Sequence, residues 1–400
     1  ELAFTGNSAG FVYKSIDFIE ARADSELDVT IVLGGPNHIA LGLIAEIYVH
    51  CKGSYENMSK EEAASNPVGS GPYEFVKWDK GSQIVLKKAK NPPIPTNFEN
   101  IIWRVIPEAS TRTAELIAGN VDMITNASPD QVEAIDASST ASVSKVQGTR
   151  RMYVGFHQGP EFAVTPGGAA IQKPEVRRAL QYAVDVEAIC ANLLNAPCTR
   201  MTGIVNPNNA HPTLKPYPYD PEISEYLLDQ AGYPRDANGV RFEMTLQAGE
   251  GRYLNDKNVV LAICQYLDDV GVKTNCEIMD WSSVYIPLII KKAAGPMYFI
   301  GSGGATWSPL YDMADLSKPD SGPNYTKWMN EEWFKGWKVI NNTTNEYIIR
   351  REVDRMLEVF YNEGPWLHLY FQPDFYGVSN RVSWSPRRDE KVDLFKATLK

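Results

Sequence analysis

The chain has 400 residues, with 39 lysines and arginines against 49 aspartates and glutamates, so its formal net charge is −10. Hydrophobic residues make up 44% and charged residues 22%, which suits a folded protein of two or three domains and excludes wholesale disorder. Such an acidic chain is not expected to bind nucleic acid or an anionic membrane surface, because both need clustered basic residues. The sequence also lacks an apolar run of about 18 residues, the length that a membrane-spanning helix requires.

The first part of the chain is predicted to be rich in strands. Alternating apolar residues predict two strands within 15–33 and a hairpin over 73–89, whose turn has the sequence DKGS. A strand over 101–107, a helix that ends at Gly119 and a strand over 121–125 form a predicted β-α-β unit.

From residue 151 onward, predicted strands alternate with predicted helices. A strand over 151–157 leads through a loop rich in proline and glycine to a long helix over 173–194. The later predicted helices cover 220–233, 255–271, 282–295 and 345–364, and the later predicted strands cover 241–248, 272–279, 297–301 and 366–378. This alternation predicts an α/β fold in which helices cross over between the strands of a sheet.

The chain is expected to fold into two lobes. Lobe I comprises residues 1–152 together with 373–400, and lobe II comprises residues 153–372. The C-terminal stretch is too short to form a domain, so we expect it to return to lobe I.

The segment 66–73, NPVGSGPY, combines two glycines with two prolines and could be mistaken for a phosphate-binding loop. A phosphate loop needs a helix directly after its glycines, so that backbone N–H groups meet the anion. Here the following residues alternate as a strand, and Pro72 has no N–H to offer. The segment is therefore predicted to be a tight turn that leads into a strand.

Catalytic and metal-binding motifs are not evident in the sequence. The five histidines are scattered; His157 and His368 lie near strand ends and could reach a cleft, although packing is the commoner fate of such side chains. The glycine-flanked Ser302 lacks the pattern of a nucleophile elbow. Among the five cysteines, Cys190 and Cys198 are spaced to bridge around a helix end, or they are small buried thiols.

The loop 301–312, GSGGATWSPLYD, is the best candidate for a ligand site. It follows the end of a predicted strand, where ligands of α/β sheets usually bind, and its glycines allow a close approach of backbone. Trp281 follows the end of the preceding strand, although plain aromatic packing would explain the same pattern. Trp328, Trp333 and Trp337 are assigned to core packing. The candidate ligand-binding residues are Trp281, Ser302, Gly303, Gly304, Ala305, Thr306, Trp307, Tyr311 and His157.

Several sequence blocks together point to a family. In chain order they are NPVGSGPYEFVKWDKGSQIVLKK, IIWRVIPEASTRTAELIAGNVDMI, RMYVGFH, KPEVRRALQYAVDVEAI, YDPEISEYLLDQAGYP and WLHLYFQPDFYGVSNRV. These blocks resemble the extracytoplasmic solute-binding proteins of family 5, which serve ABC importers of oligopeptides, dipeptides, nickel chelates and some oligosaccharides. The resemblance implies a two-lobed fold of the periplasmic-binding-protein type (type II, with an extra subdomain) and a ligand cleft between the lobes. It also implies a monomer in the periplasm or a cell-surface lipoprotein, a membrane permease as partner, and neither cofactor nor catalysis.

The chain departs from the family pattern in ways that bear on the ligand. Family members ordinarily have further residues, including part of the first lobe, ahead of position 1. Peptide-binding members carry in the glycine loop an aspartate that pairs with the peptide ammonium, and this position falls at Ala305. The tryptophan common in that loop falls at Ser302, whereas Trp281 is kept.

The missing aspartate disfavours a peptide with a free amine, because a buried ammonium needs a counter-charge. Aromatic faces among small polar groups suit an oligosaccharide. A peptide stays open, with Asp280 or Asp312 as the alternative partner of its ammonium. Two other functions stay open as well: a hydrolase that uses these two carboxylates, and a chaperone or sensor on the same fold.

Overall fold

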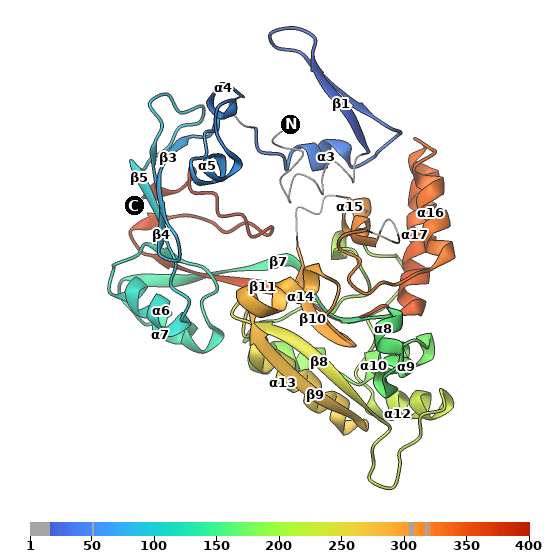
Figure 1. Cartoon of the computed structure of the whole chain (residues 1–400). Coiled ribbons are helices and arrows are strands. Elements are labelled where there is room, and N and C mark those ends of the chain that lie inside the picture. The colour runs from blue at the N-terminus through green and yellow to red at the C-terminus, as the bar shows by residue number, and fades with distance from the viewer. Residues whose placement is uncertain (1–16, 50–51, 304–307, 317–318, 320) are drawn as a thin grey trace. The chain divides into compact units, whose positions relative to one another are not determined.

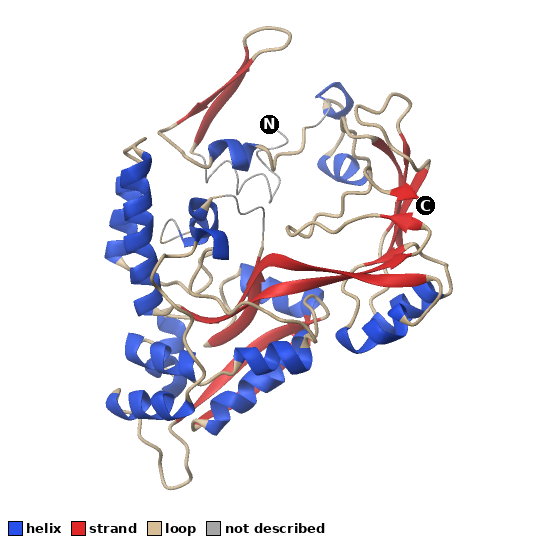
Figure 2. Cartoon of the chain, turned by 180° about the vertical axis from the view of Figure 1, so that it is seen from behind, coloured by secondary structure: helices blue, strands red, loops and turns tan. Residues whose placement is uncertain are grey.

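The computed structural model describes residues 17–49, 52–303, 308–316, 319 and 321–400. The described chain forms two compact units (Figures 1 and 2). Unit 1 takes in the chain up to Val146 together with Phe375–Arg387 and Lys391–Lys400, and unit 2 takes in Gln147–Asp374 and Arg388–Glu390. The backbone therefore passes between the units at 146/147, 374/375, 387/388 and 390/391. That these units act as functional lobes stays a prediction.

Unit 1 is built from small sheets and short helices. Strands β1 (Phe18–Ala23) and β2 (Val29–Leu33) form an antiparallel pair, and the predicted hairpin is present as β3 (Tyr73–Asp79) and β4 (Gln83–Lys88). The segment 66–73 leads into β3 without a helix, as the sequence predicts. The other elements are α3 (Ala40–Ile44), α4 (Lys52–Tyr55), α5 (Lys60–Ser65), β5 (Asn100–Arg104), α6 (Ala109–Ile117), β6 (Met123–Ile124), α7 (Val132–Asp136), β12 (Val382–Ser383) and β13 (Thr398–Leu399).

The β-α-β unit predicted around Gly119 is wrong. Strand β5 pairs with β4 in a three-stranded sheet, whereas β6 pairs antiparallel with Gly377 and Val378 in a different sheet. The elements themselves are where the sequence places them, and α6 ends just before Gly119, whose φ of 76° suits a helix stop. Periodicity identified the strands but carried no information about their pairing partners.

The large sheet has the strand order β6-β11-β7-β10-β8-β9. Strands β8 (Phe242–Glu250) and β9 (Val272–Asp280) are parallel, and β10 (Met297–Ser302) is parallel to β8. The helix α13 (Asp256–Asp269) crosses between β8 and β9 and packs against both, as the apolar periodicity predicts. Strand β7 (Ala141–Phe156) runs antiparallel to β10.

The remaining helices of unit 2 surround this sheet and the loops that follow it. They include the pair α10 and α12, which pack on one another, and the pair α16 and α17, which do the same. Their bounds are α8 (Pro160–Ala163), α9 (Pro166–Ala170), α10 (Pro174–Tyr182), α11 (Val186–Leu193), α12 (Pro221–Gln230), α14 (Ile286–Ile290), α15 (Pro309–Met313), α16 (Glu331–Ile340) and α17 (Glu346–Glu363), with β11 (Trp366–Ser379) closing the series.

Two predicted helices differ from the structure. The helix expected over 173–194 is broken into α10 and α11, because the Asp185 side chain accepts a hydrogen bond from the Ala188 N–H (2.8 Å) and starts a new helix there. The helix expected over 282–295 ends at Ile290, and Lys292 then adopts a left-handed backbone with a φ of 53°.

Most of the buried aromatic side chains of the described residues lie in unit 2. Trp328, Trp333 and Trp337 are buried, in agreement with the core-packing interpretation. The Trp328 ring meets the Trp333 ring edge-on at 5.4 Å between centroids. In the described part of the chain, no helix combines the length and apolar character needed to cross a membrane.

Two disulfides lie in unit 2. Cys190 of α11 is bonded to Cys198, one of the two alternatives left open by the sequence. Cys264 of α13 is bonded to Cys276 of β9, which ties the crossover helix to the strand that it leads into. The sequence did not single out this second pair, because its members are 12 residues apart and on different elements.

Candidate ligand-binding edge of unit 2

Parallel strands place the candidate residues at one edge of the large sheet. Because β8, β9 and β10 run parallel, the loops that follow Glu250, Asp280 and Ser302 leave the sheet on the same side. Antiparallel β7 brings Arg151 to this edge, directly opposite Ser302. We call these loops, together with Arg150 and Arg151, the carboxyl edge.

Trp281 is held at the carboxyl edge by aromatic neighbours. It begins a single π-helical turn, Trp281–Tyr285, and its ring is edge-on to the ring of Tyr253, 5.2 Å away at 78°. A Cβ on Gly249 would lie only 2.8 Å from the Trp281 ring, so the glycine is what lets this ring lie against β8. The ring is half-buried, so part of its surface stays exposed.

Tyr253 joins the loop after β8 to the start of the glycine loop. Its hydroxyl accepts a hydrogen bond from the Gly301 N–H (3.0 Å) and donates one to the Gly301 carbonyl (3.2 Å). Burial raises the pKa of this hydroxyl, which keeps it protonated and able to donate. The guanidinium groups of Arg150 and Arg252 lie 5.6 Å and 5.3 Å from the ring centre, which is the distance of a cation–π contact.

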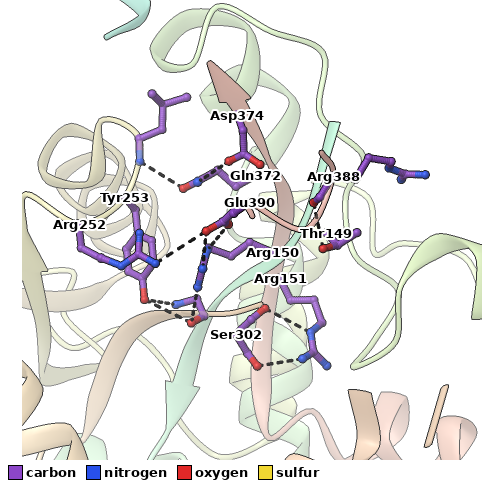
Figure 3. A network of polar contacts seen from close by, with 12 residues as sticks. Thr149, Arg150, Arg151, Arg252, Tyr253, Ser302, Gln372, Asp374, Arg388 and Glu390 are labelled. Carbon is purple, nitrogen blue, oxygen red and sulfur yellow. Dashed lines mark hydrogen bonds and ion pairs between the residues drawn. The ribbon is translucent and has the colours of Figure 1, made fainter. Parts of the chain in front are cut away.

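Glu390 binds both of these arginines (Figure 3). Its two carboxylate oxygens accept hydrogen bonds from Nε and Nη2 of Arg150, a bidentate pair, and Arg252 lies 3.8 Å from the same carboxylate. The Arg150 side chain is 14% exposed and that of Arg252 is 35% exposed, so Arg252 is the more accessible of the two cations. The Arg150 guanidinium carbon also lies 3.0 Å from where a Cβ of Gly303 would be, directly under the glycine loop.

Ser302 is part of a buried ionic cluster. Its hydroxyl donates to Oδ2 of Asp315 (2.7 Å) and accepts from Nη2 of Arg151 (2.8 Å). Arg151 also lies 3.6 Å from Asp312 and 3.5 Å from Asp315. Burial raises the pKa of both carboxyl groups, and Arg151 offsets part of this effect. The cluster anchors the end of β10, and the Ser302 hydroxyl makes its two hydrogen bonds to groups of the protein itself.

The structure brings Trp281, Ser302 and Gly303 together at the carboxyl edge. Tyr311 is half-buried on α15, beyond the glycine loop. Gly304, Ala305, Thr306 and Trp307 lie outside the described residues.

His157 is not brought to this edge. It follows Phe156, which pairs with Met297 at the opposite end of β10 from Ser302, five residues or about 17 Å along the strand. The ring is fully buried; Nδ1 accepts from the Gly159 N–H, and Nε2 lies 3.0 Å from the Lys292 carbonyl. His368 is also fully buried, and desolvation lowers its pKa to about 3. Packing accounts for both histidines.

The two carboxylates considered for an ammonium or for catalysis have local partners. Asp280 accepts from both the N–H and the hydroxyl of Ser283 and so caps the π-helical turn. Asp312 is fully buried, accepts from the Asn206 N–H (2.9 Å) and pairs with Arg151. Within the described ranges, no group of three or more His, Cys, Asp or Glu side chains is arranged to hold a metal ion.

Arg150, Arg252, Tyr253 and Glu390 were missed by the sequence reasoning. Arg252 and Tyr253 follow the predicted strand 241–248, so the rule that selected Trp281 would have selected them as well. Glu390 is 240 residues from Arg150 and carries no local signal of their pairing.

Comparisons with known proteins agree on one family. The model for the bacterial extracellular solute-binding proteins, family 5 Middle, matches residues 3–324. The oligopeptide-binding protein AppA of Bacillus subtilis is 22% identical over 409 residues, covering 95% of this chain and 72% of the relative. The glutathione-binding protein GsiB of Escherichia coli K12 is 26% identical over 324 residues, covering 77% of this chain and 60% of the relative. The chain thus spans less than two thirds of the latter protein.

Solved structures show the same fold. AppA of Bacillus subtilis in complex with a nonapeptide has a TM-score of 0.82 at 18% identity, covering 100% of this chain and 82% of that structure. The periplasmic binding protein DppA of Helicobacter pylori in complex with the peptide STSA has a TM-score of 0.81 at 19% identity, covering 99% of this chain and 77% of that structure.

Proposed function

Because the chain belongs to the bacterial extracellular solute-binding proteins of family 5, we propose that it is the substrate-binding receptor of an ABC importer. It captures a small solute outside the cytoplasm and delivers it to a membrane permease, without covalent chemistry. The carboxyl edge is the contribution of unit 2 to the solute site. The observation that carries this proposal is the half-buried Trp281 ring, held by Tyr253 beside the Arg252 guanidinium.

A peptide-like solute with a carboxylate fits this edge best. Arg252 offers a planar set of N–H donors that matches a carboxylate, and Trp281 offers a flat apolar face. The relatives named for oligopeptide and glutathione binding support the same class, because both ligands carry carboxylates. A neutral oligosaccharide has no anionic group to pair with the Arg252 charge.

The hydrolase hypothesis receives no comparable support from the edge. A pair of catalytic carboxylates has to reach the substrate, whereas Asp312 is fully buried against Arg151 and Asp280 is used as a helix cap. The two disulfides favour an oxidising compartment, which supports a location outside the cytoplasm as a periplasmic protein or surface lipoprotein.

The decisive experiment is calorimetric titration of the purified chain with the tetrapeptide Ser-Thr-Ser-Ala, its C-terminal amide and maltotetraose. We expect binding of the free acid, weakening of about tenfold or more for the amide, and no binding of the sugar. Trp281→Ala and Arg252→Gln should each weaken binding of the free acid, whereas Arg178→Gln, at a partly exposed position on α10, should not. Binding of the sugar but not of either peptide would overturn the proposed solute class, and unchanged affinity in both edge variants would overturn the site.

A further inference from the structure

The backbone passes between the units at four places. Asp374, or a residue that surrounds its carboxyl group, lies at three of them. Gly148 lies just after the passage at 146/147, Asp374 just before 374/375, and Glu390 just before 390/391. A Cβ on Gly148 would lie 2.5 Å from Oδ2 of Asp374, so β7 and β11 approach closely at this point. Figure 3 shows Asp374 with its hydrogen-bond partner Gln372 and, in the same view, Glu390 with Arg150 and Arg252.

The Asp374 carboxyl is poorly prepared to carry a charge. It is 4% exposed, and Oδ1 accepts one hydrogen bond, from Nε2 of Gln372 (3.1 Å). Among the described residues, Oδ2 has no hydrogen-bond partner. A buried carboxylate with an unsatisfied oxygen is costly, whereas the protonated group avoids most of that cost.

The charged groups around Asp374 shift its pKa in opposite directions. Burial is the largest influence on its pKa, and the negative charge of Glu390 raises it further. The Gln372 hydrogen bond and the positive charges of Arg150 and Arg252 lower it. The balance leaves the pKa at about 7, so that the group changes its charge near neutral pH.

Two chains of contacts connect Asp374 to functional parts of unit 2. Through Gln372, whose Oε1 accepts from the Leu254 N–H (3.2 Å), it reaches the loop that carries Arg252 and Tyr253. The second connection is electrostatic: the positive charges of Arg150 and Arg252 act on Asp374, and both arginines pair with Glu390, the last residue of segment 388–390.

Segment 388–390 is itself fastened to β7. The Arg388 carbonyl accepts from both the N–H (2.9 Å) and the hydroxyl (3.1 Å) of Thr149, and Arg388 Nε donates to the Gln147 carbonyl (3.0 Å). The bidentate pair of Glu390 with Arg150 completes the attachment.

We propose that Asp374 is a proton-operated switch for segment 388–390. With Asp374 protonated, Glu390 holds Arg150 and Arg252 without a competing anion. When the proton leaves for solvent, two carboxylates face the same two guanidinium groups. The repulsion between Asp374 and Glu390 then weakens the attachment of 388–390 to β7. Solvent pH thereby sets how firmly the chain is held where it passes between the units.

Hydrogen exchange of the full chain without solute, followed by mass spectrometry at about pH 6 and about pH 8.5, tests this proposal. Rates are corrected for the intrinsic effect of pH and compared with those of β8 in the same sample. We expect the Thr149 amide, which donates to the Arg388 carbonyl, to lose protection by about tenfold at the higher pH, the equivalent of one pKa unit of coupling. Since no solute is present, the result is independent of the proposed import function.

Three variants test whether the response to pH comes from Asp374 and Glu390. Asp374→Asn keeps the shape and cannot ionise, so its Thr149 amide should stay protected at both pH values. Glu390→Gln removes the bidentate pair with Arg150, so its Thr149 amide should have the lower protection at both. Asp269→Asn, an exposed change at the end of α13, should behave as the parent protein does. The switch is overturned if the parent shows no change with pH, or if Asp374→Asn keeps the parent's pH response.

Discussion

The Tyr253 hydroxyl bridges both polar groups of the Gly301 peptide backbone, accepting from the N–H at 3.0 Å and donating to the carbonyl at 3.2 Å. One side chain therefore fixes the point at which β10 gives way to the glycine loop. Both hydrogen bonds depend on a single oxygen atom, so they can be removed together.

Tyr253→Phe should lower both stability and solute affinity. The change leaves the ring contacts in place and removes both bonds to Gly301, for an expected loss of about 1–2 kcal/mol in the free energy of unfolding. Urea unfolding and calorimetric titration with a peptide measure the two effects. Tyr226→Phe is the matched control, because Tyr226 is 62% exposed. Equal stability of the two variants would contradict the bridging role.

Gly249→Ala should displace Trp281. The added methyl group would lie 2.7 Å from the Tyr285 ring and 2.8 Å from the Trp281 ring, closer than van der Waals contact allows. Such overpacking costs about 1–3 kcal/mol, and tryptophan fluorescence should report the shift of the ring. In Gly203→Ala the nearest atom is 3.7 Å away, so that variant should show neither effect. A normal spectrum and normal stability in Gly249→Ala would show that the edge accommodates the methyl group.

Arg151→Met should be the most destabilising of these substitutions. The arginine is buried between Asp312 and Asp315, and its loss leaves two buried carboxyl groups without their cation. Breaking a buried pair in this way costs about 3–5 kcal/mol. Arg178→Met, which changes a partly exposed arginine 4.0 Å from Glu175, should cost well under about 1 kcal/mol. Similar melting temperatures for the two variants would mean that the cluster contributes little to stability.

Asp374→Asn should become more stable than the parent protein as pH rises. The folded pKa of Asp374, about 7, lies above its ordinary value of 3.8. The folded protein therefore holds a proton that the unfolded chain has already lost, and the parent loses stability between about pH 4 and about pH 7. The Asp374→Asn variant does not lose stability in this way. The difference in unfolding free energy between the variant and the parent should therefore grow by roughly 2 kcal/mol from about pH 5.5 to about pH 8.5. Urea unfolding of both proteins at each pH measures it, and a constant difference would place the pKa outside this range.

The local pattern of apolar residues predicted individual helices and strands better than it predicted where a helix breaks or which strands pair. The alternation in 241–248 and the helical period in 255–271 identified β8 and α13, because each segment buries one face. The break at Asp185 was missed, since the apolar period continues through it and only the capping bond reveals the new helix. The pairing of β5 and β6 with different sheets depends on contacts far along the chain, which periodicity does not encode.

The candidate site was predicted in part, for a similar reason. Trp281, Ser302 and Gly303 lie at strand ends, which the sequence marks clearly, and the structure places these three at the carboxyl edge. Glu390 pairs with an arginine that is distant in sequence, and the pKa of Asp374 depends on burial and on charges that no local motif contains.

The four passages of the backbone between the units also determine how the protein can be taken apart. A single proteolytic cut between residues 148 and 374, outside the loops closed by the two disulfides, leaves two fragments, each containing pieces of both units. This is because Phe375–Arg387 and Lys391–Lys400 belong with the N-terminal part. Nicking this protein therefore cannot release either unit as one intact polypeptide. A separately folded unit 2 would have to be made by design, with 147–374 joined to 388–390 through an artificial linker so that Glu390 can still reach Arg150.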